Sequence, residues 1–223
     1  MTQSAQSVIL DFDGTVADSF AMAVEIAQTL LTEYEYPVPS QEAIYAMREL
    51  SAAQLIKVAK ISPRHMPSML RYVRREQKKI IHKVKPIEGI EPILKALSQK
   101  YTLAIISSSE ASLIDDFLVK YKLRDYISDI VGGAGLFTKH RPIKRYMKQH
   151  GLGAKDVLYV GDEVRDIDAA RRAGVPIVSV GWGFNGEHVI KKNHPTVYVD
   201  DPKLLGKAID QVLSKHSKTG ESE

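Results

Sequence analysis

The chain has 223 residues, of which 44% are hydrophobic and 26% are charged, a balance that is typical of a globular protein and excludes a disordered or fibrous one. It has no run of about 20 apolar residues, and its first seven residues lack the basic and apolar regions of a signal peptide, so we expect a cytoplasmic protein without membrane contact. The absence of cysteine excludes disulfides, thiolate metal sites and cysteine nucleophiles, which leaves oxygen or imidazole to hold any metal.

The formal net charge of +4 is unevenly distributed. Between Lys57 and Lys85, ten Lys and Arg residues accompany a single acid, Glu76, so this segment carries a charge of +9. Such a segment can steer anionic substrates, bind a polyanion such as nucleic acid, or form an ordinary solvated helix face. The solvated face is the simplest interpretation, and no aromatic interleaving or nucleic-acid module favours the second role.

The first half of the chain is predicted to hold one strand followed by helices. Residues 8–10 are an apolar β-branched run that predicts a buried strand, and it ends at two acidic residues. From Phe20 to Val84 the pattern is helical, with breaks at 37–40, Ser51 and 61–63 that indicate about four helices. The last of these helices has one apolar stripe and a basic remainder, which predicts a packed helix with a cationic outer face.

Beyond residue 86 the chain alternates between strands and helices, a pattern that indicates a parallel sheet covered by helices on both faces. The predicted strands are 102–106, 129–131, 157–160, 177–180 and 197–199, and the predicted helices are 111–121, 141–150, 164–173 and 202–213. The first strand must join this sheet, because its backbone groups have no other partner. The helical block is therefore an insertion in a doubly wound domain, and 214–223 is expected to be a polar tail.

Four polar motifs lie at the carboxyl ends of predicted strands, the edge at which open α/β sheets bind their ligands. The first is Asp11-Phe12-Asp13-Gly14-Thr15, whose two carboxylates point the same way from an extended chain. The second is the serine triplet 107–109, which offers hydroxyls and backbone N–H groups to phosphate oxygens. The third is Lys139, just before a helix, and the fourth is Gly161-Asp162-Glu163-Val164-Arg165-Asp166.

These residue types together indicate phosphoryl chemistry. Oxygen ligands without cysteine or paired histidines favour Mg²⁺, and Asp11 and Asp162 are the natural pair to bind it. A divalent cation and Lys139 would make several converging carboxylates tolerable and would leave a site for an anion. One carboxylate can then attack phosphorus to form an aspartyl-phosphate, and Asp13 can exchange protons with the leaving group and with water.

Residues 7–215 resemble the haloacid dehalogenase superfamily in these four motifs, in their order and in the position of the helical insertion. The resemblance is to the members with a helical cap that are similar to phosphoglycolate phosphatase and β-phosphoglucomutase. The resemblance implies that Asp11 is the nucleophile and a Mg²⁺ ligand, and that Asp13 is the general acid and base and also binds Mg²⁺ through its backbone carbonyl. The remaining implied roles are charge stabilisation by Lys139, phosphate binding by Ser107 and Ser108, metal binding by Asp162, and orientation of the site by Asp166. We add Gly14 and Thr15 to the phosphate-binding residues and Asp166 to the metal ligands.

The second aspartate of the first motif narrows the expected reaction. Related dehalogenases and phosphonatases lack it and transport ATPases have threonine there, so Asp13 implies phosphomonoester hydrolysis. Two departures weaken an assignment to phosphoglycolate itself: Ser108 stands where many phosphoglycolate phosphatases have asparagine, and Val16 stands where leucine is more usual.

Several of these residues also have ordinary structural interpretations. Lys144 and Lys148 lie near Lys139 and could take its place, and the serine triplet could simply cap the following helix. Asp166 could be a first-turn acid that favours the helix dipole. Glu163 is expected to face solvent.

Two further features lie outside the four motifs. Gly181-x-Gly183-x-x-Gly186 matches a dinucleotide fingerprint, but too little chain follows it for a second nucleotide-binding half. We interpret Trp182, Phe184 and Asn185 as a loop at the sheet edge that floors the substrate pocket. Arg48, in the helical insertion, is a candidate substrate-binding residue, with a surface arginine as the alternative.

We therefore predict an α/β protein with a Rossmann-like parallel-sheet core, residues 1–18 and 86–223, and an inserted all-helical cap domain, residues 19–85. The predicted function is Mg²⁺-dependent hydrolysis of a small phosphorylated metabolite resembling phosphoglycolate. A sugar phosphomutase and a non-catalytic phosphate-binding scaffold are the alternatives. We expect a monomer or homodimer with no nucleic-acid or membrane partner.

Overall fold

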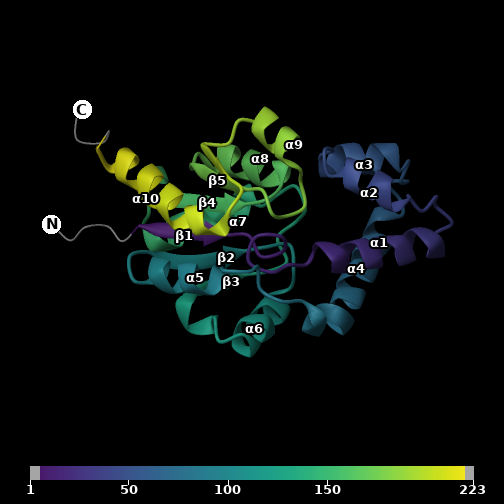
Figure 1. Ribbon diagram of the computed structural model, residues 1–223, viewed down its shortest axis with the longest axis horizontal. Coiled ribbons are helices and arrows are strands. Elements are labelled where there is room, and N and C mark those ends of the chain that lie inside the picture. Colours follow the sequence, from purple (N-terminus) through teal and green to yellow (C-terminus); the bar gives the residue numbers. More distant parts are fainter. Residues whose placement is uncertain (1–5, 219–223) are drawn as a thin grey trace.

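The structure is a computed structural model that describes residues 6–218. Figure 1 shows a sheet with helices on both faces and a second group of helices that stands beyond one end of the sheet. Within the described residues, six parallel strands form the sheet in the order β3-β2-β1-β4-β5-β6. They are β1 (Ser7–Leu10), β2 (Thr102–Ile106), β3 (Asp129–Val131), β4 (Val157–Gly161), β5 (Ile177–Val180) and β6 (Val197–Val199). The predicted α/β fold is confirmed, with each strand within one residue of its expected bounds.

The first strand lies at the centre of the sheet, as its need for backbone partners predicts. Ser7 is in register with Thr102 of β2 on one side and with Val157 of β4 on the other. Successive residues of β1 point to opposite faces, so Val8 belongs to one buried cluster and Ile9 to the other. The carboxyl end of β1 therefore opens between two neighbouring strands, at the middle of the sheet edge.

Helices cover both faces of the sheet. They are α5 (Ile90–Ser98), α6 (Ala111–Lys120), α7 (His140–His150), α8 (Val164–Ala173), α9 (Glu187–Lys192) and α10 (Pro202–Lys218), with single 3-10 turns at Ile81–Lys83, Arg124–Tyr126 and Ala154–Asp156. Buried residues of α5, α6 and α10 belong to one core cluster, and buried residues of α7, α8 and α9 belong to the other. The sheet thus has an apolar layer on each face, as a parallel sheet requires.

Three helices differ from the predicted set, which lacks α5 and the short α9 and ends the last helix at residue 213. Helix α5 is absent from that prediction, because Pro92 interrupts its apolar pattern; Pro92 lies in the first turn, where the helix needs no N–H from it. Helix α10 continues to Lys218 instead of giving way to a tail at residue 214, since nothing after the buried Leu213 breaks it. The rest of the expected tail, 219–223, lies outside the described residues.

Between β1 and α5 the described chain has four helices, which we call the cap helices: α1 (Phe20–Glu33), α2 (Gln41–Met47), α3 (Ala52–Val58) and α4 (Met66–Ile80). All three predicted breaks fall in the loops between them. Helix α1 packs against α4, and Met69 and Tyr72 of α4 are buried while its basic residues lie on the exposed faces. No helix in the described part of the chain combines the length and apolar character needed to cross a membrane.

The packing of α5 predicts the stability of the core. Leu94 is fully buried between α5 and the sheet, so Leu94→Ala should lower the free energy of unfolding by about 2–5 kcal/mol, measured by urea denaturation. Leu204→Ala is the matched control, because Leu204 is 47% exposed and its truncation should change stability by no more than about 0.5 kcal/mol. Equal effects of the two changes would contradict this account of the core.

Candidate active site

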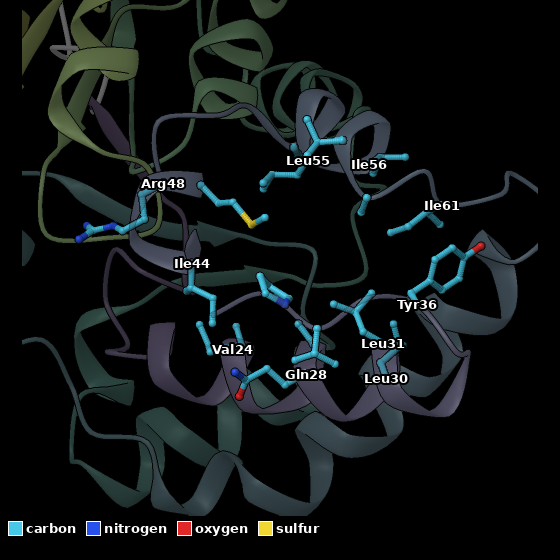
Figure 2. Close-up of a pocket in the computed structure, with 18 of the residues that line it drawn as sticks. Val24, Gln28, Leu30, Leu31, Tyr36, Ile44, Arg48, Leu55, Ile56 and Ile61 are labelled. Atoms are coloured by element: carbon cyan, nitrogen blue, oxygen red, sulfur yellow. The ribbon is translucent and has the colours of Figure 1, made fainter. Parts of the chain in front are cut away.

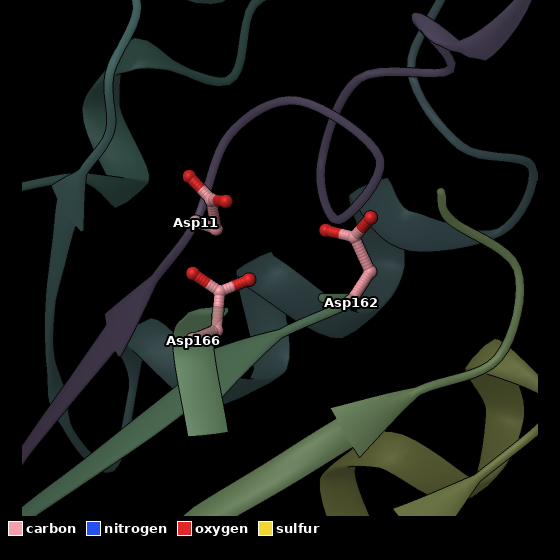
Figure 3. A group of neighbouring side chains, drawn as sticks. All are labelled: Asp11, Asp162 and Asp166. Atoms are coloured by element: carbon pink, nitrogen blue, oxygen red, sulfur yellow. The ribbon is translucent and has the colours of Figure 1, made fainter. Parts of the chain in front are cut away.

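Three carboxylates meet at the carboxyl edge of the sheet. Asp11 follows β1, Asp162 follows β4, and Asp166 lies in the first turn of α8. Figure 3 shows the three side chains grouped beyond the ends of these strands, and an oxygen of each lies within 4.8 Å of an oxygen of the others. All three side chains are buried. The structure thus brings together three of the four predicted metal-ligating residues.

Lys139 is the cation of this cluster. Its Nζ lies 2.5 Å from Oδ2 of Asp11 and 2.8 Å from Oδ1 of Asp166, and its side chain is 1% exposed. The alternatives Lys144 and Lys148 are exposed on α7, outside the cluster. The structure therefore places Lys139 beside the carboxylates, as the sequence predicts.

Burial and mutual repulsion govern the protonation of these groups. Burial raises the pKa of Asp11 to about 6, although Lys139 acts in the opposite direction. Burial, with the nearby charges of Glu163, Asp166 and Asp11, raises the pKa of Asp162 well above its usual value. Burial alone would lower the pKa of Lys139, but the charges of Asp11 and Asp166 outweigh burial and raise it. One buried ammonium therefore faces more negative charge than it can balance, which favours binding of a further cation.

Asp13 lies beside this cluster and has a different partner. Its Oδ2 accepts a hydrogen bond of 2.5 Å from Oγ of Ser109. Its Oδ1 is buried and has no hydrogen-bond partner among the described residues. One oxygen is thus held by the protein while the other is left for a ligand.

Ser109 is a site residue that the sequence pattern marks only as part of a serine triplet. The alternative role for that triplet, capping of α6, is not observed: Glu110 is the N-cap residue of α6, and no side chain makes the capping hydrogen bond. Of the two serines predicted to bind phosphate, Ser107 is buried and its backbone N–H donates to the carbonyl of Val131 at 3.0 Å. Ser107 can therefore donate to a phosphate only through its hydroxyl. Ser108 is half-buried.

The two remaining residues of the first motif pack against Asp162. Oγ1 of Thr15 donates to Oδ1 of Asp162 at 2.8 Å, so its side chain positions a carboxylate. The backbone N–H of Thr15 donates to the carbonyl of Phe12 at 3.3 Å and that of Gly14 to the carbonyl of Ala17 at 2.9 Å, so both N–H groups are used within the chain and not by phosphate, contrary to the prediction. Gly14 has a φ of +75°, and a Cβ at this position would lie 2.3 Å from Oδ2 of Asp162. The motif needs glycine here for both reasons.

The glycine-rich loop 181–186 holds Asp162 from the other side. The backbone N–H of Phe184 donates to Oδ2 of Asp162 at 2.7 Å. A Cβ at Gly183 would lie 2.2 Å from the same oxygen, so this glycine allows the close approach of a carboxylate. Asn185 accepts a hydrogen bond of 2.9 Å from the N–H of Val164, at the start of α8. The glycine-rich loop 181–186 thus holds the carboxylate of Asp162 in place.

Arg48 joins the cap helices to this loop. Its guanidinium donates to the carbonyl of Gly183 at 2.7 Å and to that of Phe184 at 3.2 Å, and it lies over the ring of Phe20. Asn185 returns hydrogen bonds to the carbonyls of Arg48 and Leu50. Arg48 uses Nε and one Nη nitrogen for these contacts, and its contact with substrate stays a prediction.

Glu163 differs from expectation. The sequence analysis expects it to face solvent, but it is 9% exposed and forms an ion pair with Arg165. The charge of Arg165, which lies two residues further along the same turn, is the physical reason that Glu163 can be buried beside Asp162.

Comparisons with known proteins agree with this geometry. A family model described as haloacid dehalogenase-like hydrolase matches residues 8–180. A phosphoglycolate phosphatase of Synechococcus elongatus is 31% identical over 210 residues, covering 93% of this chain and 99% of the relative. Among solved structures, a predicted phosphatase from Clostridium acetobutylicum superimposes with a TM-score of 0.80 at 21% identity, covering 94% of this chain and 100% of that one. A predicted phosphoglycolate phosphatase from Haemophilus somnus gives a TM-score of 0.73 at 20% identity, with coverage of 94% and 100%. The extent of the family match and the full-length similarity to the Synechococcus protein show that this chain belongs to the haloacid dehalogenase-like hydrolases.

Proposed function

We propose that the protein is a Mg²⁺-dependent phosphatase that hydrolyses a small phosphorylated metabolite through an aspartyl-phosphate on Asp11. The observation that carries this proposal is the buried group of Asp11, Asp162 and Asp166 around the single ammonium of Lys139. Full-length relatives are named phosphoglycolate phosphatase, so phosphoglycolate is the reference substrate.

The residues present fit a divalent cation with a preference for oxygen. Three carboxylates offer oxygens within 4.8 Å of one another. Burial, together with the neighbouring carboxylates, raises the pKa values of Asp11 and Asp162, and a bound cation would favour their charged forms. The carboxylates of Asp11, Asp162 and Asp166 and the carbonyl of Asp13 would hold the ion. When bound, Mg²⁺ would neutralise and orient the phosphoryl oxygens.

Asp11 is the proposed nucleophile. Its Oδ1 accepts the N–H of Phe12 and its Oδ2 accepts Nζ of Lys139, so the carboxylate is held in one orientation. One of its oxygens forms a bond to phosphorus as the bond from phosphorus to the leaving oxygen breaks. Lys139 would balance the negative charge on the phosphoryl oxygens, and Ser107 and Ser108 would bind them.

Asp13 is the proposed general acid and base. Ser109 holds its Oδ2, which leaves Oδ1 to give a proton to the leaving oxygen. In the second half of the reaction the same carboxylate would take a proton from the water that attacks the aspartyl-phosphate, so Asp13 ends the cycle in its starting state.

We also propose that residues 1–18 and 86–223 act as the core and residues 19–85 as a cap that covers the site. The two connecting segments lie side by side, since the N–H of Asp18 donates to the carbonyl of Lys85 at 2.9 Å and that of Ile87 to the carbonyl of Val16 at 2.9 Å. Paired connections of this kind would let the cap helices move together and exclude water from the reaction. Arg48 would anchor the cap to the core and is the proposed contact with the leaving group.

The nucleophile is tested by phosphate release from phosphoglycolate and other phosphorylated metabolites. Wild type should be active with Mg²⁺ and inactive in EDTA, and Asp11→Asn should lower turnover by a factor of about 10³ or more, because no carboxylate remains to attack phosphorus. The circular dichroism spectrum controls for folding. Residual activity of more than a few per cent in Asp11→Asn would defeat the assignment. If wild type binds Mg²⁺ but releases no phosphate from any compound, the phosphomutase or scaffold alternative is favoured instead.

Asp13→Asn tests proton transfer separately from attack. This variant keeps all three clustered carboxylates, including the nucleophile Asp11, so Mg²⁺ binding should be retained while turnover falls by a factor of about 10²–10⁴. Intact-protein mass spectrometry should detect trapped phospho-enzyme if the second half of the reaction is the slower one. Wild-type turnover in Asp13→Asn would remove the acid and base role.

The raised carboxylate pKa values predict that protons compete with the metal. Without metal, Asp11 takes up a proton as the pH falls through about 6, and that proton must leave when Mg²⁺ binds. Calorimetric titration should therefore give an apparent Mg²⁺ affinity that is about fourfold weaker at pH 5.5 than at pH 7.5. In Asp11→Asn the affinity should be lower at both pH values and should change less between them. An affinity independent of pH in wild type would contradict the burial effect.

A further inference from the structure

A cavity of about 890 Å³ lies among the cap helices and is not used by the proposed mechanism. Figure 2 shows it between α1, which carries Val24 and Leu31, and the α2–α3 pair, which carries Ile44, Leu55 and Ile56. Protein interiors are close-packed and hold few voids larger than a water molecule, whereas ligand pockets have volumes of about 300–1,000 Å³. The volume lies in the range of ligand pockets, and the exposed Val38 and Val58 in the lining show that the cavity opens to solvent.

The cavity is kept open by the way the cap helices are attached. Helix α1 packs against α4, whereas the α2–α3 pair is attached to the core by hydrogen bonds of the segment between the two helices. Arg48 exchanges hydrogen bonds with Gly183 and Asn185 of the loop 181–186, and Glu49 accepts the N–H of Val189 in α9. Within α2 and α3, both fully described, no residue is buried, and Ile44, Leu55 and Ile56 line the cavity. The core thus holds α2 and α3 away from α1.

The cavity borders the proposed metal site. Its core-side wall is made by Glu163, Phe184 and Asn185. Glu163 follows Asp162 in the chain, the N–H of Phe184 donates to Oδ2 of Asp162, and the N–H of Asn185 donates to the Asp162 carbonyl. A group attached to a phosphoryl at Asp11 and projecting past Asp162 would reach this wall.

The charges of the cavity select what can enter it. Among the described lining residues only Arg48, Lys60 and Glu163 are charged. Arg48 is engaged by two carbonyls and Glu163 by Arg165, while Lys60 precedes Ile61, which lies at the end of the cavity opposite Arg48 (Figure 2). The two carbonyls that Arg48 contacts are neutral, so its positive charge remains at the core-side end. Beyond Arg48 the lining is mainly apolar, which suits an alkyl or aryl group.

We propose that this cavity binds the leaving group of the substrate and that the preferred substrates are phosphomonoesters with an apolar alkyl or aryl body. The inference rests on the proposed phosphatase activity and refines its substrate class. The phosphoryl group stays at Asp11, and the alcohol that departs is the part bound among the cap helices.

The test is kcat/KM for ethyl, butyl and hexyl phosphate. The leaving alcohols have nearly equal pKa values, so differences within the series report burial of the chain. The value should rise about fourfold for each added methylene, and hexyl phosphate should exceed phosphoglycolate. A flat series with ethyl phosphate still hydrolysed would overturn this proposal and leave the phosphatase activity standing.

Two matched variants locate the effect. Ala27→Trp places a large ring in the cavity from α1 and should flatten the series. Ala53→Trp, on α3 but outside the cavity lining, should keep the full slope and the wild-type turnover of ethyl phosphate. Binding of hexylphosphonate and methylphosphonate, which are not hydrolysed, tests the same cavity without catalysis. Calorimetry should show the hexyl compound bound at least tenfold more tightly by wild type and Ala53→Trp but not by Ala27→Trp. Equal affinities in wild type, or no binding of either compound, would also overturn the proposal.

Discussion

Three carboxylates and one ammonium, all buried at the edge of a parallel sheet, are the arrangement on which the rest of the site depends. Lys139 lies between Asp11 and Asp166, and Asp162 is close enough to both to add to the repulsion. A charge in so dry a place is tolerable only when it is paired and hydrogen-bonded. The surplus of negative charge therefore favours binding of a cation, and the proposed function adds an anionic phosphoryl group beside it.

The surroundings of Asp162 show how much structure is needed to hold one such carboxylate. The hydroxyl of Thr15 and the N–H of Phe184 each satisfy one of its oxygens, and two glycines allow the backbone to approach it without a clash. The loop that provides this N–H also accepts a hydrogen bond from Arg48 of the cap, through the carbonyl of Gly183. The position of the cap is thus linked through one loop to the position of a proposed metal ligand.

The cap helices are divided in their attachments, and this division is the basis of the binding of the leaving group that we propose. Helices α1 and α4 form a packed pair, while α2 and α3 depend on the core and leave an apolar cavity beside the site. A cap built in this way can exclude water from the reacting phosphoryl group and at the same time offer its own apolar surface to the leaving group. The basic side chains of α4 lie on its exposed faces, opposite the side that packs. This position agrees with the simplest interpretation of the +9 segment, a solvated helix face.

The sheet, the insertion and most of the charged site follow from patterns within the sequence. Strand and helix alternation is a local pattern, and carboxyl ends of parallel strands meet at one edge, so the sequence pattern is enough to place residues as distant as Asp11, Lys139 and Asp162 together. The pairing of Ser109 with Asp13, the burial of Glu163 against Arg165 and the turn of Arg48 toward two carbonyls arise only in the folded chain. These contacts depend on side-chain directions that have no periodic signature. The cavity is equally hidden from the sequence, because an apolar residue that lines a pocket and one that fills a core have the same pattern, and only the packing of the helices distinguishes them.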